Sequence, residues 1–375
     1  MNPHQRPPHP HPRNPATDAP PHVARYAPAR WLPGGHAQTI WPAIVAPRPA
    51  VQYRRQRWTT PDQDFVDIDF VGPPPNADGR PIVVLFHGLE GSAQSHYARA
   101  LMAAVEGSGW RGAVAHFRGC SGEPNLAPRA YHSGDSDEID WILRRIAAEH
   151  GRGPVLAVGV SLGGNALLKW LGERGEDARF VSAAAAVSAP QDLLAGATAL
   201  ARGFNRVYTR NFLATLKRKS LIKLEQHPGL FDRARMLAAR DFFGFDNDVT
   251  APMHGFRDCY DYWARSSCKP WLAGIRVPTL VLNALNDPFL PAHALATRPD
   301  VSADVVLEYP RHGGHVGFLC GALPGRIDWL PQRLIGFFRT ATGGPPAVQG
   351  LAVAARPDHT KAGPPAGPAP GGDAR

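Results

Sequence analysis

The sequence predicts an α/β fold in which helices cover both faces of a mostly parallel sheet. Short, continuous apolar runs such as IVVLF at 82–86 are typical of strands that are buried on both faces. Stretches of helical periodicity alternate with these runs, and such alternation indicates βα units. A long segment at about 190–270 interrupts the alternation and has helical periodicity of its own.

The expected elements follow one another in a regular order. Two early strands come before the parallel part of the sheet, and we expect them to pair antiparallel. The expected strands lie at 51–58, 65–71, 82–86, 113–117, 155–158, 180–187, 279–284 and 304–309. The expected helices lie at about 95–107, 135–149, 162–175 and 326–341.

The segment at 190–270 is too long for an ordinary connection between a strand and a helix. It is interpreted as a helical cap inserted over the carboxyl edge of the sheet. Two interpretations of its aromatic residues stay open, namely packing of the cap against the core and lining of a pocket for an acyl chain. These aromatic residues are Phe204, Tyr208, Phe212, Phe242, Phe243 and Phe245.

Both ends of the 375-residue chain have the composition of disordered tails. The chain contains 38 glycines and 39 prolines, and much of that excess lies in residues 1–30 and 343–375. Such segments bury too little apolar surface to offset the entropy lost on ordering. One domain of ordinary size for an α/β enzyme is therefore predicted at 31–342, with the cap inserted into it.

The four cysteines are widely spaced and form no CxxC pair, which argues against a zinc site and a disulfide framework. Free thiols favour a reducing compartment. The amino-terminal segment lacks the apolar core of a secretory signal, and no apolar stretch reaches 18 residues. We therefore expect a cytoplasmic protein that needs no metal ion and no organic cofactor.

The formal net charge is +9, and the densest basic run lies between residues 206 and 223. Apolar residues interleave with the basic ones, which indicates an amphipathic helix. One interpretation is a solvated helix face, and the other is peripheral contact with an anionic membrane surface. No nucleic-acid-binding motif accompanies the charge, so no nucleic-acid partner is expected. The basic residues are Arg206, Arg210, Lys217, Arg218, Lys219 and Lys223.

The strongest local signal for chemistry is GVSLG at 159–163, a GxSxG motif between an apolar strand and a helix. A sharp turn there lifts the Ser161 hydroxyl clear of the sheet, and the motif glycines leave room for that turn. The N–H of Leu162 then lies at the start of the helix, where it can stabilise an oxyanion. A second donor is expected from the turn HGLEGS at 87–92, with the N–H of Leu89 as the candidate.

Serine needs a base, and the base needs an acid to orient it. In folds of this type the chain order is serine, acid, histidine. Asp287 in NDPF follows the strand at 279–284 and is the preferred acid, with Asp192 as the alternative. His315 follows the strand at 304–309 and is the preferred base, whereas His312 is assigned to the loop.

Together these motifs resemble the YheT-like branch of the α/β-hydrolases, which includes eukaryotic membrane-associated lipases and yeast medium-chain acyltransferase/esterases. The resemblance covers about residues 30–340. It implies the α/β-hydrolase fold and carboxylic-ester hydrolysis by Ser161, Asp287 and His315. The matching segments are WLPGGHAQTIWP (31–42), HGLEGS (87–92), HFRGCSGEPNLAPRAYHSGDSDEI (116–139), GVSLGGNALLKWLGE (159–173), TAPMHGFRDCYDYW (250–263) and NDPFLP (286–291).

The expected substrate is a small-molecule ester with a short- to medium-chain acyl group or a lipid-like structure. Two alternatives stay open: an acyltransferase that passes the acyl group to an alcohol, and a non-catalytic protein that binds lipid surfaces. The segment GGHAQT at 34–39 has no derived role, and a structural place near the cap is expected for His36. Cys120 is not expected to be a nucleophile, because the sequence pairs no base with it.

Overall fold

The computed structural model describes residues 25–74, 78–150 and 152–343. The tails expected at 1–30 and 343–375 lie mostly outside the described residues. One described residue of the expected amino-terminal tail, Tyr26, donates a hydrogen bond to the Leu319 carbonyl, and its ring packs on Phe318 and Trp329. The packed part of the chain therefore starts several residues before the predicted boundary at 31.

Eight strands form one sheet in the order β1-β2-β4-β3-β5-β6-β7-β8. β1 and β2 pair antiparallel, β2 joins β4 antiparallel, and all other neighbours are parallel. The predicted fold class is confirmed. The strands are β1 (Arg54–Thr59), β2 (Phe65–Val71), β3 (Ile82–Phe86), β4 (Arg111–Ala115), β5 (Val155–Val160), β6 (Val181–Val187), β7 (Thr279–Leu282) and β8 (Val305–Glu308).

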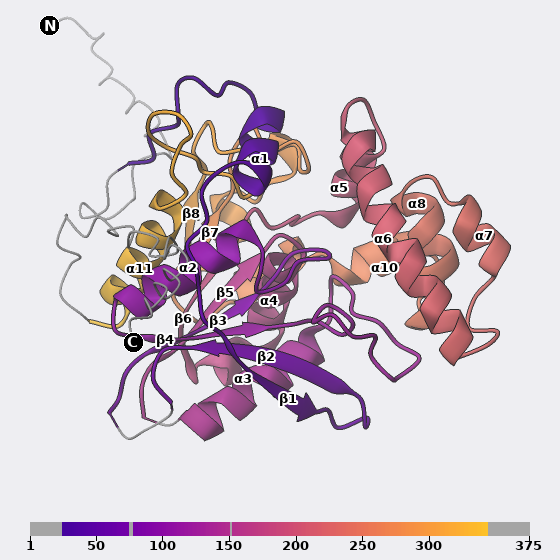
Figure 1. Ribbon diagram of the computed structural model, residues 1–375, viewed down its shortest axis with the longest axis horizontal. Coiled ribbons are helices and arrows are strands. Elements are labelled where there is room, and N and C mark those ends of the chain that lie inside the picture. The colour runs from indigo at the N-terminus through magenta and orange to yellow at the C-terminus, as the bar shows by residue number, and fades with distance from the viewer. Residues whose placement is uncertain (1–24, 75–77, 151, 344–375) are drawn as a thin grey trace, which may run out of the picture.

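Helices cover both faces of this sheet (Figure 1). The side chains of β3 show how one strand serves both layers, because successive residues point to opposite faces. Val84 and Phe86 pack with the helices of one face, whereas Leu85 packs with those of the other. The first face carries α3 (Ser136–His150) and α4 (Leu162–Arg174), and the second carries α2 (His96–Gly107) and α11 (Trp329–Ala341).

Some boundaries differ from the prediction. β4 begins at Arg111 rather than 113, because the Arg111 N–H bonds to the Pro81 carbonyl at the start of β3 pairing. α11 begins at Trp329 rather than 326, because the backbone of Arg326 pairs with Cys320 instead. An additional helix, α1 (Gly35–Ile44), was not predicted.

The segment between β6 and β7 is helical and lies beside the sheet layers, at the right of Figure 1. It has its own apolar cluster, which includes Leu213, Phe231 and Met236. None of the described helices combines the length and the hydropathy needed to cross a bilayer. The helices here are α5 (Leu193–Leu200), α6 (Asn205–Gln226), α7 (Arg233–Ala238), α8 (Phe242–Phe245), α9 (Ala251–Met253) and α10 (Cys259–Ser266).

A buried ion network joins the loop after β4 to the turn between β1 and β2 and to α3. Arg118, whose side chain is 4% exposed, contacts the carboxylates of Asp62, Asp64 and Glu138. The carboxylates of Asp64 and Glu138 are also buried. Buried charges are tolerated when they are paired and hydrogen-bonded, so the network holds this loop in place.

Replacing Arg118 by Met should lower the free energy of unfolding by about 3–5 kcal/mol, because two buried carboxylates lose their cation. Urea titration followed by circular dichroism measures the change. The control is Arg144→Met, which removes the more exposed ion pair with Asp140 and should cost less than about 1 kcal/mol. Equal, small losses in both variants would contradict a stabilising role for the network.

Candidate active site

Ser161 lies at the turn between β5 and α4, in a backbone conformation that serine rarely adopts. Its φ is 52° and its ψ is −119°. Such strain persists only where the surroundings hold it. A Cβ on Gly163 would lie 2.4 Å from the Phe86 carbonyl oxygen, and one on Gly159 would lie 2.4 Å from the Gly163 oxygen. The two motif glycines are therefore required by the close approach of α4 to the sheet.

The structure brings Ser161, His315 and Asp287 together. The Ser161 Oγ lies 2.9 Å from Nε2 of His315, and Nδ1 of His315 lies 2.8 Å from Oδ2 of Asp287. Because a carboxylate can only accept, Nδ1 carries the hydrogen and Nε2 is left to accept from the serine. The second carboxylate oxygen accepts the Phe289 N–H at 2.8 Å, and the Phe289 ring lies 4.2 Å from the imidazole.

The two alternatives from the sequence lie in other environments. Asp192 caps the start of α5 by accepting the Ala195 N–H at 2.9 Å. His312 is exposed on the loop after β8, three residues before His315. Neither side chain borders the cavity that contains Ser161.

The segment GGHAQT supports the two loops that carry Asp287 and His315, a role that the sequence did not reveal. It forms the start of α1, and its Gln38 accepts both the Asn286 side-chain N–H and the Gly313 N–H, each at 2.9 Å. The Thr39 hydroxyl accepts the His315 N–H at 2.8 Å. α1 therefore fastens the loop after β7 to the loop after β8.

Close approach makes glycine necessary at both ends of this contact. A Cβ on Gly35 would lie 2.0 Å from the Asn286 oxygen, and one on Gly317 would lie 1.8 Å from the Gln38 oxygen. His36, one residue along, contacts the cap instead, with Nδ1 at 3.2 Å from the Tyr208 hydroxyl. The segment thus contacts the two loops and the cap at once.

The N–H groups of Leu89 and Leu162 have no hydrogen-bond acceptor among the described residues. The neighbouring N–H groups are occupied, since Gly88 donates to the Tyr97 hydroxyl and Glu90 to the Tyr131 hydroxyl, both at 2.9 Å. Leu89 and Leu162 also border the cavity with Ser161. Both amides are therefore available to a developing negative charge.

His87 orients the Leu89 peptide from beneath. Its Nε2 accepts the Phe117 N–H at 3.1 Å, so its Nδ1–H donates to the Gly88 carbonyl at 2.8 Å. Burial is the main reason that the pKa of His87 falls to about 3, and the nearby His116 lowers it further. The low pKa keeps the ring neutral. Because the Gly88 carbonyl and the Leu89 N–H belong to one peptide, holding the carbonyl directs the N–H the opposite way.

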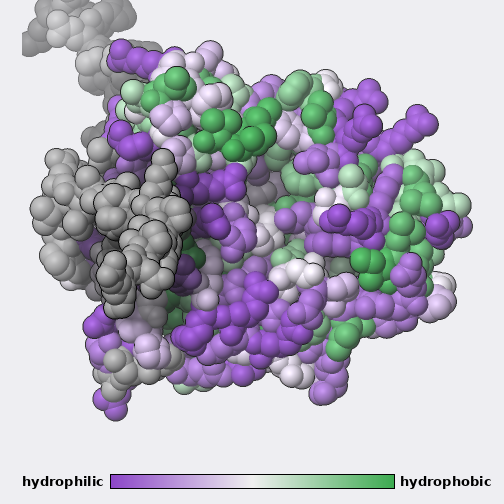
Figure 2. All heavy atoms as spheres, viewed as in Figure 1, coloured by the Kyte–Doolittle hydropathy of each residue, from purple (hydrophilic) through white to green (hydrophobic). Residues whose placement is uncertain are grey.

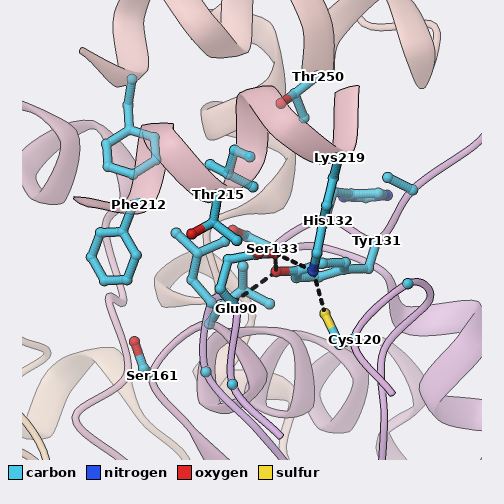
Figure 3. A pocket seen from close by; sticks show the side chains of 18 of the residues that line it. Glu90, Cys120, Tyr131, His132, Ser133, Ser161, Phe212, Thr215, Lys219 and Thr250 are labelled. Carbon is cyan, nitrogen blue, oxygen red and sulfur yellow. Dashed lines mark hydrogen bonds and ion pairs between the residues drawn. The ribbon is translucent and has the colours of Figure 1, made fainter. Parts of the chain in front are cut away.

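A cavity of about 920 Å³ lies above Ser161, between the sheet edge and the cap. In Figure 3, Phe212 and Ser161 lie at the left, whereas Lys219, Tyr131 and Cys120 lie at the right. The aromatic residues of the cap fall into two groups, those that border this cavity and those that do not. Tyr208, Phe212, Phe242 and Phe245 border the cavity, whereas Phe243 packs on Trp263 and Phe204 is half exposed.

The basic run forms part of α6. Its lysines bond to other parts of the protein, whereas its arginines are exposed. Lys217 donates to two cap carbonyls, Lys219 pairs with Glu90, and Lys223 donates to the carbonyls of Asn125 and Ala127. The remaining residues of the run, which are all arginines, are exposed: Arg206, Arg210 and Arg218.

No group of three potential ligands that could hold a metal ion occurs among the described residues. All four cysteines are free. Burial raises the pKa of the Cys120 thiol to about 11, so the thiol stays protonated at neutral pH.

Replacing Gln38 by Leu should lower the free energy of unfolding by about 1–3 kcal/mol, because the Asn286 and Gly313 donors lose their buried acceptor. The loop at 311–318 should also exchange its amide hydrogens faster, which mass spectrometry of the peptides measures. The control is Gln94→Leu, at an exposed amide that accepts from Arg99. Unchanged exchange at 311–318 in Gln38→Leu would contradict the fastening role of α1.

Residues 81–321 match the family model described as the alpha/beta hydrolase fold. The chain is 40% identical to the putative esterase YheT of Escherichia coli, over 83% of this chain and 92% of that one. It is 29% identical to the phospholipase ABHD3 of Homo sapiens, over 82% of this chain and 76% of that one. A monoacylglycerol lipase of Saccharomyces cerevisiae is 27% identical, over 71% of this chain and 59% of that one.

These matches agree with the sheet order and with the motifs from which the resemblance was drawn. The match to YheT covers most of the chain. The chain belongs to the α/β-hydrolase family, in its YheT-like branch.

Proposed function

We propose that this protein is a serine hydrolase of carboxylic esters, with Ser161 as nucleophile, His315 as base and Asp287 as the orienting acid. The observation that carries the proposal is the continuous hydrogen-bonded chain from Asp287 through His315 to Ser161, with distances of 2.8 and 2.9 Å. The series of hydrogen bonds ends at Ser161, which lies on a strained turn beneath a cavity. Esterase and lipase relatives support the same reaction class.

In the proposed reaction, Nε2 of His315 takes the proton of Ser161 as the serine oxygen attacks the ester carbonyl. The N–H groups of Leu89 and Leu162 stabilise the oxyanion, and Asp287 stabilises the imidazolium. His315 then protonates the leaving alcohol, which departs and leaves an acyl-serine. Water, activated by the same histidine, releases the acid and restores the serine.

The substrate in this proposal is an ester with an apolar acyl part. Phe212, Phe289 and Leu193 border the cavity and supply apolar surface for an acyl chain. A cavity of about 920 Å³ accommodates a lipid-like ester of moderate size. Transfer to an alcohol instead of water uses the same acyl-serine, and the partition between free acid and butyl ester in added butanol distinguishes the two outcomes.

Ser161→Ala should lower kcat for p-nitrophenyl butyrate by about 10⁴–10⁶-fold, because the acyl-serine cannot form. Asp287→Asn should lower kcat by about 10⁴-fold, because it favours the wrong histidine tautomer. Asp192→Asn, at the alternative acid, is the matched control and should stay within about threefold of wild type. Full activity of Ser161→Ala, or an Asp192→Asn loss as large as that of Asp287→Asn, would overturn the assignment.

We further propose that the protein meets its substrate at an anionic lipid surface. Residues 25–61 and 193–224 both border the cavity and contain no aspartate or glutamate. Exposed apolar residues stand on these segments, with Ile44 72% and Val207 57% exposed. Figure 2 shows apolar side chains gathered over α1, beside the hollow that separates α1 from the cap. Apolar residues flanked by arginines are typical of an interfacial contact.

Arg206→Glu combined with Arg210→Glu should weaken binding to vesicles of phosphatidylcholine and phosphatidylglycerol by at least about tenfold, since each basic residue contributes about 1 kcal/mol near an anionic surface. Cosedimentation measures the binding, and hydrolysis of soluble p-nitrophenyl butyrate should be unchanged. The control is Arg152→Glu, at an exposed arginine before β5, at the opposite edge of the sheet. Equal binding by the double variant and wild type would contradict the proposed contact.

A further inference from the structure

Glu90 directly follows the oxyanion donor Leu89 and has a left-handed backbone, with φ at 56°. This conformation costs a residue other than glycine about 1–3 kcal/mol, and it persists only where neighbouring groups hold it. The direction of the Leu89 N–H depends on the Gly88 carbonyl on one side and on the Glu90 backbone on the other, because all three residues share one turn. Groups that hold Glu90 therefore act on the oxyanion site.

Two side chains hold Glu90, one from the core and one from the cap (Figure 3). The Tyr131 hydroxyl accepts the Glu90 N–H at 2.9 Å and donates to its Oε1 at 2.8 Å. Lys219 of α6 donates to the same Oε1 at 2.8 Å, across a separation of 129 residues. The other carboxylate oxygen, Oε2, is buried and has no hydrogen-bond partner among the described residues.

The peptide between Gly88 and Leu89, which carries the Leu89 N–H, is held by residues of the core. The Gly88 carbonyl accepts from His87 at 2.8 Å and from the Gly91 N–H at 2.9 Å, and the Gly88 N–H donates to Tyr97. These partners all belong to the core. Lys219 is thus a cap residue that acts on a turn otherwise held by the core.

α6 reaches from one catalytic loop to the other. Near its start, the Asn205 side chain donates to the Pro288 carbonyl at 2.6 Å, beside the proposed acid. Fourteen residues later, or roughly 21 Å along the helix axis, Lys219 reaches Glu90. A displacement of α6 away from the core would therefore separate Lys219 from Glu90.

We propose that Lys219 is a positioning residue that couples closure of the cap to completion of the oxyanion site. Its ammonium group holds the Glu90 carboxylate, which together with Tyr131 fixes the turn that aims the Leu89 N–H. When α6 lifts, the carboxylate loses its cation while remaining beside Tyr131, and the turn relaxes. The inference rests on the proposed function, because it assigns regulation to the same site.

Two features of the contact between Lys219 and Glu90 favour a role in positioning the turn over a role in attaching the cap. The ion pair is largely withdrawn from solvent, with side-chain exposures of 33% for Lys219 and 9% for Glu90. Lys223, further along α6, and His227, directly after the helix, bond to carbonyls of the loop at 125–127 and continue to hold the cap when Lys219 is changed. A neutral residue at 219 therefore removes the hold on Glu90 while the cap stays attached.

The test compares Lys219→Met with Lys219→Arg and with Lys217→Met. Lys217 lies on the same helix but donates only to carbonyls of the cap, at Leu237 and Ala239, and so is the matched control for cap stability. Lys219→Met should lower kcat for p-nitrophenyl butyrate by about 10- to 100-fold, since loss of a whole oxyanion donor costs 10²–10³-fold. KM should change less than threefold, and Lys219→Arg should restore most of kcat.

A second readout is the rate of labelling by a fluorophosphonate, whose phosphoryl oxygen occupies the oxyanion site. This rate should fall in parallel with kcat in Lys219→Met and stay unchanged in Lys217→Met. Wild-type kcat in Lys219→Met, an equal loss in Lys217→Met, or a change confined to KM would overturn the inference. Ser161→Ala separates the two claims, because its full activity would defeat the proposed function, whereas an inactive Ser161→Ala beside an unaffected Lys219→Met defeats only the coupling.

Discussion

The hydrogen bond between Ser161 and His315 is the contact on which the rest of the site depends. It joins two loops that are 154 residues apart in the chain. A bond of this kind requires that both loops be placed to within a few tenths of an ångström. The sheet brings the loops to one edge, because the strands before them are parallel and end on the same side. The remaining precision comes from contacts between the loops.

Those contacts come from three separate parts of the chain. The glycines of the turn at Ser161 let α4 approach β3 and β5, which raises the serine above the sheet. α1 fastens the loops of Asp287 and His315 through Gln38 and Thr39. The cap helix α6 contacts the loop of Asp287 at one end and the turn of Leu89 and Glu90 at the other. A site assembled in this way can be disturbed from outside the residues proposed to react.

Much of this arrangement follows from local patterns in the sequence. The buried strand at 82–86 and the parallel pairing of strands were predictable from apolar runs. The motif GVSLG predicted a strand, a turn and a helix. The loops of Asp287 and His315 were predictable because each follows a recognisable strand. For these features, one short segment contains the whole signal.

Other features depend on contacts that no short segment contains. α1 begins at Gly35, directly after the N-cap Gly34, and contains Pro42, so local propensity argues against a helix. Tertiary contacts of Gln38 and Thr39 override that propensity. Lys219 looked like one member of a solvated basic run, although its partner Glu90 lies 129 residues away. Periodicity in a sequence predicts which side of a helix is apolar and which is polar. It does not predict which distant residue a polar side chain will contact.

The central claim is that Ser161 becomes acylated during turnover. Intact-protein mass spectrometry, after rapid acid quench of a reaction with a slowly released p-nitrophenyl ester, tests it most directly. The account predicts one added acyl group per chain, mapped by peptide sequencing to the peptide containing Ser161 and absent from Ser161→Ala. An acyl group on Cys120 or another residue, or turnover without any acyl-enzyme when release is the slow step, would contradict it.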